Sequence, residues 1–328
     1  METLEETELC FPQLLNRSCR KPMRPHFETM IYILLLSFFS SLLTVALNLL
    51  VIISISHFKQ LHSPTNLLLL SLAVSDFIVG LLMFFSIMLI DGCWFLGDLM
   101  CTLYVYLGYV NSSASTGSMV LISVDRYVAI CHPLHYSSGI TQKRVQVCVC
   151  LCWICSLIFQ CLILKDIMKQ PGRDHSCIGE CILFINHIAE LVDLTFSFIV
   201  PITVIIVLYM RIFVVAVSQA RAMRSHIAAV TQTGKVTAKK SEMKAARTLG
   251  VVVVLFLICL CPYYCVALTG QDNFLSAASA AFVLWLYSFN SCLNPVVYAF
   301  CYPWLRKSVK LMVTFKILQA DSSEANIL

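Results

Sequence analysis

The chain has 328 residues, of which 59% are hydrophobic and 12% are charged, and its formal net charge is +5. Ordinary soluble domains carry about 25% charged residues, so this composition excludes most soluble classes and indicates a membrane protein. The 17 cysteines mostly stand singly in apolar runs, where cysteine behaves as a small hydrophobic residue. The acidic stretch METLEETELC lacks the apolar core of a cleavable signal peptide.

Seven apolar runs are long enough to cross about 30 Å of hydrocarbon as helices. Pro201, Pro262 and Pro295 lie inside these runs, and we expect them to kink the helices because neighbouring helices satisfy the freed carbonyl groups. The fold class predicted is all-α, a seven-transmembrane helix bundle. In chain order, the runs cover residues 28–56, 65–90, 98–131, 145–164, 183–214, 246–268 and 277–301.

The segment YPWLRKSVKLMVTFKIL after the seventh run alternates basic and bulky apolar residues at helical spacing. This pattern predicts a short amphipathic helix on the cytoplasmic membrane surface, attracted to anionic lipid. We therefore expect an N-terminal part of residues 1–27, a seven-helix domain of residues 28–301, and an amphipathic helix with a tail over residues 302–328. The last residues, QADSSEANIL, are expected to be disordered.

The loops predict which end of the bundle faces outward. Of the 23 Lys and Arg residues, 16 lie on the face that holds the loops after the first, third and fifth runs and the C-terminal tail, and 7 lie on the opposite face. The positive-inside rule therefore places the N-terminus outside the cell. The glycosylation sequon at Asn16 fits that exterior. The same face carries an even number of cysteines suited to disulfides, namely Cys10, Cys19, Cys93, Cys101, Cys177 and Cys181.

Several motifs follow one another along the runs: Asn48, Asp76 in LAVSD, Asp125-Arg126-Tyr127, Pro262 in CPYY, and NPVVY at residues 294–298. An Arg beside an Asp at a membrane boundary is, by itself, typical of a simple interfacial pair. As a set, however, these motifs resemble those of the rhodopsin-like G-protein-coupled receptors over nearly the whole chain. The resemblance implies a multi-pass plasma-membrane receptor with a heterotrimeric G protein as partner.

The resemblance also assigns roles near the cytoplasmic face. Asp125 would hold Arg126 in the inactive state, and Glu242 would be a second restraint; activation would free Arg126 for the G protein. An agonist must bind the active arrangement better than the inactive one, because equal affinity shifts no equilibrium. The residues expected to serve coupling and activation are Asp125, Arg126, Tyr127, Glu242, Tyr209, Pro262, Asn294, Pro295 and Tyr298.

A polar set is expected in the middle of the membrane. The resemblance implies an allosteric sodium ion anchored by Asp76, whereas the alternative is a water-filled hydrogen-bond network, which buried polar groups need in any case. No other metal and no cofactor are expected. The set consists of Asp76, Asn111, Ser115, Asn290 and Asn294.

A narrower resemblance rests on three stretches: NSCLNPVVYAFCYPW at 290–304, CIGEC at 177–181 and CWFLGDLMC at 93–101. They are similar to the trace amine-associated receptors, a vertebrate chemosensory family, although Leu305 replaces the usual Phe. This resemblance implies small amine ligands, a stimulatory G protein and cyclic AMP. It also implies disulfides, for which we expect the pairs Cys101–Cys181, Cys10–Cys177 and Cys19–Cys93.

Most amine receptors hold the ligand's ammonium with an Asp on the third helix, seven residues after the disulfide Cys. Counting from Cys101 gives Gly108, so the expected acid is missing. Asp193 lies instead inside the fifth apolar run, where a charge near the bilayer centre costs about 2.5–3.5 kcal/mol. A fish branch of the family looks similar, with the acid on the fifth helix. We therefore expect Asp193 to hold the ammonium by a charge-assisted hydrogen bond.

Two alternatives remain for Asp193: a structural acid bonded to the fourth helix or a loop, or a solvated acid in a receptor for a non-amine or neurotransmitter-like ligand. Glu190, one turn away, either meets the second ammonium of a diamine or faces water. Aromatic faces attract cations, and Leu260 replaces the Trp that usually switches activation. The expected ligand-binding residues are Asp193, Glu190, Gly108, Tyr104, Tyr109, Ser197, Tyr263, Tyr264, Tyr287 and Ser288.

Other functional classes fit the sequence less well. A transporter would be expected to show an internal repeat and broken helix pairs framing a midplane site. An enzyme would need a nucleophile with a partnered base or a cluster of metal ligands. We therefore expect a receptor and not an enzyme, with an amine, a G protein and membrane lipid as partners and no nucleic acid.

Overall fold

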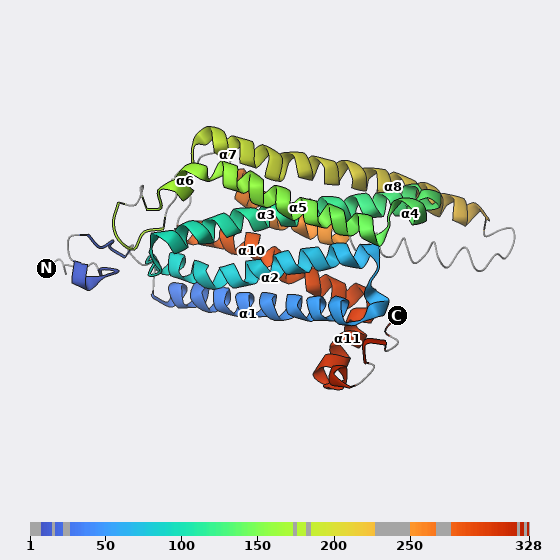
Figure 1. The fold of residues 1–328 in the computed structure, drawn as a ribbon, viewed down its shortest axis with the longest axis horizontal. Coiled ribbons are helices and arrows are strands. Elements are labelled where there is room, and N and C mark those ends of the chain that lie inside the picture. The colour runs from blue at the N-terminus through green and yellow to red at the C-terminus, as the bar shows by residue number, and fades with distance from the viewer. Residues whose placement is uncertain are drawn as a thin grey trace.

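The computed structural model describes residues 8–14, 17–21, 27–172, 176–181, 185–226, 250–266, 277–319, 322–324 and 327. The predicted all-α, seven-helix bundle is confirmed: long helices run side by side, with the two termini at opposite ends (Figure 1). Among the described residues, β-pairing is limited to two isolated bridges. The bundle consists of α1 (Phe27–His57), α2 (Pro64–Asp91), α3 (Gly97–Cys131), α5 (Gln142–Ile163), α7 (His187–Leu194) continued by η3 (Thr195–Ile199) and α8 (Val200–His226), the helical segment Gly250–Val266, and α10 (Ala277–Cys301).

Local signals explain several helix ends. The Ser63 hydroxyl accepts a hydrogen bond from the Asn66 amide at 3.3 Å, with Pro64 in the first turn, so α2 begins there. The helix ends at Gly92, whose φ of 83° favours glycine. Thr141 caps the start of α5 in the same way as Ser63. These caps satisfy backbone groups that the helix itself leaves unpaired.

Some boundaries differ from the prediction. α5 begins at Gln142 rather than 145, and the fifth helix begins at His187 rather than 183 and continues to His226. Two short helices in loops, α4 (Pro133–Gly139) and α6 (Lys165–Lys169), were not predicted. The proline at the start of α4 explains that helix, because its fixed φ suits the first helical position.

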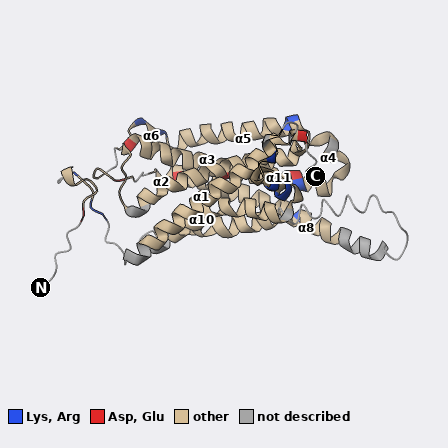
Figure 2. Ribbon diagram, turned by 90° about the horizontal axis from the view of Figure 1, so that it is seen from below, with Lys and Arg blue, Asp and Glu red and all other residues tan. Residues whose placement is uncertain are grey.

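The composition of the helices fits a membrane bundle. Four helical stretches in the described chain are long and apolar enough to cross a membrane: Ile31–His57, Pro64–Leu89, Gln142–Ile163 and His187–Ser218. α3 is longer still, at 35 residues, but turns many polar side chains into the bundle. Figure 2 shows that Lys, Arg, Asp and Glu gather mainly near the two ends of the helices, which leaves a largely uncharged middle.

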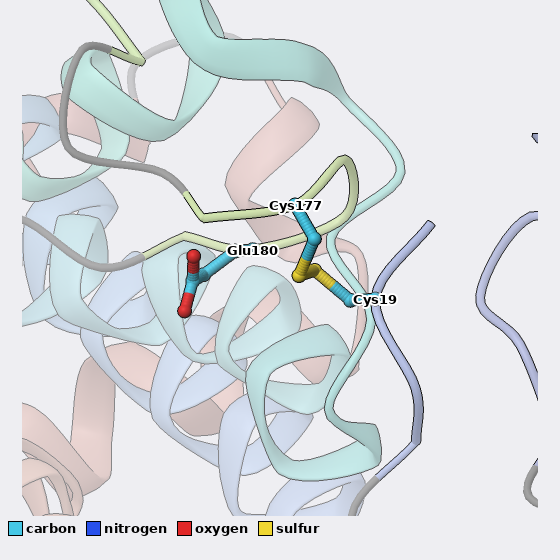
Figure 3. Close-up of side chains that lie close together, drawn as sticks. All are labelled: Cys19, Cys177 and Glu180. Atoms are coloured by element: carbon cyan, nitrogen blue, oxygen red, sulfur yellow. A yellow bond between two sulfur atoms is a disulfide. The ribbon is translucent and has the colours of Figure 1, made fainter. Parts of the chain in front are cut away.

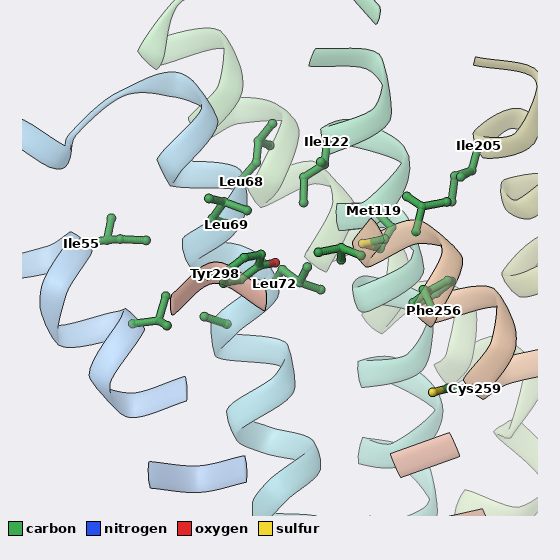
Figure 4. Packing of buried hydrophobic residues seen from close by; sticks show 14 of the residues in the cluster. Ile55, Leu68, Leu69, Leu72, Met119, Ile122, Ile205, Phe256, Cys259 and Tyr298 are labelled. Atoms are coloured by element: carbon green, nitrogen blue, oxygen red, sulfur yellow. The ribbon is translucent and has the colours of Figure 1, made fainter. Parts of the chain in front are cut away.

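The main hydrophobic core joins the helices in the half of the bundle that lies toward the C-terminus. Figure 4 shows side chains from α1, α2, α3, α8, Gly250–Val266 and α10 meeting there. Tyr298 of α10 is among the largest fully buried side chains. This core fixes the helices against one another and thereby positions the polar groups between them. The labelled members are Ile55, Leu68, Leu69, Leu72, Met119, Ile122, Ile205, Phe256, Cys259 and Tyr298.

The segment after α10 forms the amphipathic helix α11 (Pro303–Val313), which projects from the bundle in Figure 1. Trp304, Leu305 and Ser308 are buried on one side of this helix, while its Lys and Arg residues lie on the other. The prediction of disorder for the last residues is wrong where the structure describes them. Ile327 is fully buried in the main core, and its amide donates to Gln60 Oε1 at 3.2 Å beside η2 (Lys59–Leu61).

Candidate functional site

The N-terminal segment is bound to the bundle by disulfides. Cys101 and Cys181 are bonded, as expected, but the expected pairing of the other four cysteines is wrong. Cys10 is bonded to Cys93, and Cys19 to Cys177.

The backbone explains this pairing. Ser18 pairs with Ile178 in a parallel bridge, and the amide of Cys19 donates to the Ile178 carbonyl at 3.0 Å, which brings Cys19 beside Cys177. The bridge between Leu9 and Arg20 folds the chain back on itself. Cys10 then lies over Gly179 and within reach of Cys93.

Glu180 lies close to the sulfur atoms of Cys19 and Cys177 (Figure 3). Such a group can hold a metal ion only if the sulfurs are thiolates. Here the two sulfurs are bonded to each other, and a Glu180 carboxylate oxygen accepts hydrogen bonds from the Ser176 amide and hydroxyl, each at 2.7 Å. The cluster is therefore a cross-link next to a loop turn.

Asp193 lies on α7, half-buried, and makes contact with α5. Its Oδ1 accepts a hydrogen bond from Gln160 Nε2 at 2.7 Å and another from the Ser197 hydroxyl, also at 2.7 Å. Its Oδ2 accepts no hydrogen bond from the described residues, and no Lys, Arg or His among them forms an ion pair with it. The contact with Gln160 is what a structural acid would make, but it uses only one of the two oxygens.

A widened turn positions Ser197 beside Asp193. η3 is a π-helical turn over Thr195–Ile199, closed by a hydrogen bond from the Val200 amide to the Thr195 carbonyl. Pro201 follows it and has no amide hydrogen to give to the Ser197 carbonyl, so a regular α-helical ladder is interrupted here. The turn changes which side chains share a face, and Leu194, Ser197 and Phe198 are all buried.

An aromatic cluster faces the same region. Phe198 stacks on Tyr264 with ring centroids 3.7 Å apart, and Tyr263 contacts Tyr264 at 5.2 Å and Tyr287 at 4.9 Å. The Tyr287 hydroxyl donates to Ser112 Oγ of α3 at 2.6 Å. The cluster therefore links the fifth helix, Gly250–Val266, α10 and α3.

Asp193 lies near the aromatic cluster. Asp193 lies within electrostatic range of the hydroxyl groups of Tyr109, Tyr264 and Tyr287. Gly108 lies one residue before Tyr109 on α3, and a Cβ atom added to it would meet nothing within 4 Å. The position where most amine receptors carry their acid is therefore open space. A cation could bind there between an acid and several aromatic faces.

Three other expected ligand-binding residues have different surroundings. Tyr104 packs against Trp94 and Phe85, at centroid distances of 5.5 and 6.4 Å, toward α2. The Ser288 hydroxyl donates to the Leu284 carbonyl of its own helix. Glu190 is exposed and lies 3.7 Å from His187 Nδ1, although it is also within electrostatic range of Tyr109.

At the other end of α3, Asp125 and Arg126 form a buried ion pair, with side chains 2% and 7% exposed. Asp125 Oδ2 accepts from Arg126 Nε at 2.9 Å, from Arg126 Nη2 at 2.5 Å and from the Thr65 hydroxyl at 3.0 Å. The Tyr136 hydroxyl of α4 donates to Oδ1 at 2.9 Å. Burial and the neighbouring carboxylate raise the pKa of Tyr136, so its hydroxyl remains a donor. Both oxygens of Asp125 are thus engaged.

Two of the tyrosines expected in activation have buried hydroxyl groups. The Tyr209 hydroxyl lies within electrostatic range of Arg126, and the hydroxyls of Tyr209 and Tyr298 are buried with no hydrogen-bond partner among the described residues. Tyr127 packs against His132. Leu260 is buried in the main core. Glu242 and Asn16 lie outside the residues that the structure describes.

The polar set in mid-membrane is buried. Asn294 Nδ2 donates to Asp76 Oδ2 at 2.8 Å, while Asp76 Oδ1 is buried and accepts no hydrogen bond from the described residues. The same holds for the side-chain oxygens of Asn111, Asn290 and Asn294. Ser115 is buried near them on α3.

Sequence reasoning missed four residues that complete these sites: Gln160, Ser112, Thr65 and Tyr136. Gln160 had a usable signal, since a lone amide in the apolar run LIFQCLIL needs a partner as much as a charge does. Ser112 and Thr65 had none, because a Ser or Thr hydroxyl can bond to its own helix and is common in membrane spans.

Comparison with known proteins agrees with this architecture. Residues 47–298 match the family model described as 7 transmembrane receptor (rhodopsin family). Trace amine-associated receptor 13c of Danio rerio is 34% identical, over 98% of this chain and 97% of that protein. Trace amine-associated receptor 7e of Mus musculus is 36% identical over 98% and 92%, and receptor 8a of Rattus norvegicus 35% over 98% and 96%. These proteins are signalling receptors and not enzymes. The chain therefore belongs to the rhodopsin family of seven-transmembrane receptors and, within it, to the trace amine-associated receptors.

Proposed function

We propose that the protein is a chemosensory, olfactory receptor for small mono- or diamines in which Asp193 replaces the missing third-helix acid. The observation that carries this proposal is the incomplete pairing of Asp193. A carboxylate inside a helix bundle has one oxygen without a donor among the described residues, and no cation of the described chain pairs with it. A ligand ammonium supplies both the charge and the hydrogen bond that the site lacks.

Two further observations support an amine. The relatives are named for trace amines, and a Cβ atom added at Gly108, next to Tyr109, would meet nothing within 4 Å. We assign the chain to the fish-type branch, in which the fifth helix carries the acid. Glu190 would then meet the second ammonium of a diamine.

We also propose that the N-terminus is extracellular and that the G protein is of the stimulatory class. The excess of Lys and Arg at the other end of the bundle supports the orientation, as do the three disulfides at the N-terminal end. An epitope tag on the N-terminus should be stained in intact cells, and Asn16→Gln should lower the apparent mass. Staining that needs permeabilised cells would reverse the topology.

We propose that the activated receptor signals by binding the G protein at Arg126. Guanine nucleotide should then weaken agonist binding to membranes, because the G protein and the agonist favour the same state of the receptor. A nucleotide-insensitive affinity would contradict coupling to a G protein.

The polar set fits an allosteric sodium ion. A hard cation takes several oxygen ligands, and the set offers oxygens of Asp76, Asn111, Asn290 and Asn294 that accept no hydrogen bond from the described residues. Asp76 would supply the charge that anchors the ion. Sodium should lower amine affinity in wild-type membranes, and Asp76→Asn should remove that effect. A sodium effect that survives this change would leave a water network as the explanation.

The experiment that tests the main proposal measures cyclic AMP in cells that express the full chain. Straight-chain primary monoamines and diamines of graded length are applied to wild type, Asp193→Ala and Asp193→Asn at matched surface expression. A hydrogen bond to a charged group is worth about 1.5–3 kcal/mol, so we expect the EC50 to rise about 10- to 150-fold.

Glu190→Gln is the control for the second charge. It should weaken responses to diamines while leaving those to monoamines unchanged. If Asp193→Asn responds like wild type, Asp193 is a structural acid. If the wild type ignores all amines and responds to another ligand, the receptor serves a non-amine or neurotransmitter-like compound.

A further inference from the structure

Gln160 is the buried amide through which α5 contacts the proposed ammonium site. It is 0% exposed, and its Nε2 donates to Asp193 Oδ1 at 2.7 Å and to Ser197 Oγ at 3.3 Å. The Ser197 hydroxyl donates to the same Asp193 oxygen at 2.7 Å. Three side chains from α5, α7 and η3 thus close a triangle around one carboxylate oxygen.

The triangle fixes the orientation of the carboxylate. Rotation of the Asp193 carboxylate would break both short hydrogen bonds to Oδ1, since each requires a nearly linear donor. Oδ2 is left as the single oxygen that accepts nothing from the described residues. The site therefore presents one acceptor in one orientation, instead of a freely turning charge.

The carbonyl oxygen of the Gln160 side chain indicates why an amide is present at this position. This Oε1 is buried and has no hydrogen-bond partner among the described residues. A buried acceptor without a partner costs free energy, and an apolar side chain of similar size would avoid that cost. Packing alone would therefore favour an apolar residue such as methionine at position 160. The amide adds the hydrogen bond to Asp193, which methionine cannot make.

A fixed acceptor discriminates between kinds of ammonium group. A primary ammonium donates a directional N–H bond to Oδ2, which depends on the orientation of the carboxylate. A trimethylammonium has no N–H and is attracted by charge alone, which depends on distance more than on direction. Building on the proposed function, we propose that Gln160 is a positioning residue that sets the preference of Asp193 for primary amines over quaternary ones.

The test compares n-pentylamine with pentyltrimethylammonium, or the most potent straight-chain homologue of each. Gln160→Met keeps the size of the side chain and removes both the donor and the unpaired acceptor. We expect the EC50 of the primary amine to rise about tenfold while that of the quaternary amine changes less than about twofold. The comparison is made at surface expression matched to that of wild type.

Ser156→Ala is the matched control. Ser156 is buried one turn earlier on α5, and its hydroxyl donates to the Cys152 carbonyl instead of to Asp193. This variant should leave both EC50 values unchanged. A general disturbance of α5 would instead lower both responses together in Gln160→Met, and that result would overturn the positioning role.

A second variant keeps the test decisive if Gln160→Met does not reach the surface. Gln160→Asn retains the amide, but its side chain is too short to make the 2.7 Å hydrogen bond to Asp193. It should show the same selective rise in the EC50 of the primary amine. If Asp193→Asn abolishes the primary-amine response while both Gln160 variants keep the wild-type ratio of EC50 values, the present inference fails and the proposed function stands. If Asp193→Asn responds normally, the proposed function itself fails.

Discussion

Asp125 and Asp193 are two carboxylates of the same helix bundle, and their surroundings differ in one decisive respect. Asp125 accepts four hydrogen bonds through both oxygens, including two from the guanidinium of Arg126. Asp193 accepts two hydrogen bonds through one oxygen, both from neutral groups. The charge of Asp125 is therefore paired inside the protein, whereas the half-buried Asp193 has no cationic partner among the described residues, which fits the proposed binding of an external ammonium.

Asp125→Asn gives the largest effect of this comparison. Removing one partner of a buried ion pair costs about 3–5 kcal/mol, and the cost falls mainly on the inactive arrangement that contains the pair. Basal cyclic AMP should rise severalfold without any amine, and the EC50 for amines should fall. Asp193→Asn should leave basal cyclic AMP unchanged. Equal basal values in the two variants would show that the pair at Asp125 is not a restraint.

The double variant Gly108→Asp, Asp193→Asn tests whether a carboxylate on α3 can replace the one on the fifth helix. The added Cβ would meet nothing within 4 Å, so the substitution begins in open space. We expect primary monoamines to be about tenfold more potent on this double variant than on Asp193→Asn alone. Gly108→Asn in the same background is the control, since it has the same shape without the charge. Equal potencies in the two double variants would mean that the ammonium does not reach α3.

The same contrast shows what the sequence could predict. The helices follow from long apolar runs, and Asp193 was found because a charge is costly inside such a run. The pairing of Cys10 and Cys19 could not be found in this way, because four cysteines allow three pairings. The backbone bridge between Ser18 and Ile178 decides among them.

The hydrogen-bond partners of Asp125 and Asp193 could likewise not be predicted from the sequence. Gln160 and Asp193 are 33 residues apart, and their contact depends on how α5 packs beside the π-helical turn. Tyr136 lies on α4, which is too short to leave a clear periodic signal. Polar partners of this kind are set by tertiary packing, which single-sequence patterns do not contain.

Tyr136→Phe should loosen the restraint at Asp125 by a smaller amount. The change removes the hydrogen bond to Oδ1 and leaves the ion pair with Arg126 in place. A hydrogen bond to a charged group contributes about 1.5–3 kcal/mol, less than the cost of breaking the ion pair, so basal cyclic AMP should rise by less than in Asp125→Asn. Ser138→Ala is the control, because that exposed hydroxyl donates to the His135 carbonyl. No change in Tyr136→Phe would assign the whole restraint to Arg126 and Thr65.

The smallest effect is expected for the ion pair between Lys59 and Glu324. Its charged atoms lie 3.0 Å apart, and each side chain is about two-thirds exposed. Exposed ion pairs contribute about 0–1 kcal/mol, whereas Ile327 is fully buried beside the same loop. Reversing Lys59→Glu or Glu324→Lys alone should therefore release the tail only slightly, and combining them should restore wild-type protection of the tail in hydrogen exchange. Ile327→Ser should release it more, because it removes apolar burial. If the charge reversals release the tail more than Ile327→Ser does, then charge and not burial holds it in place.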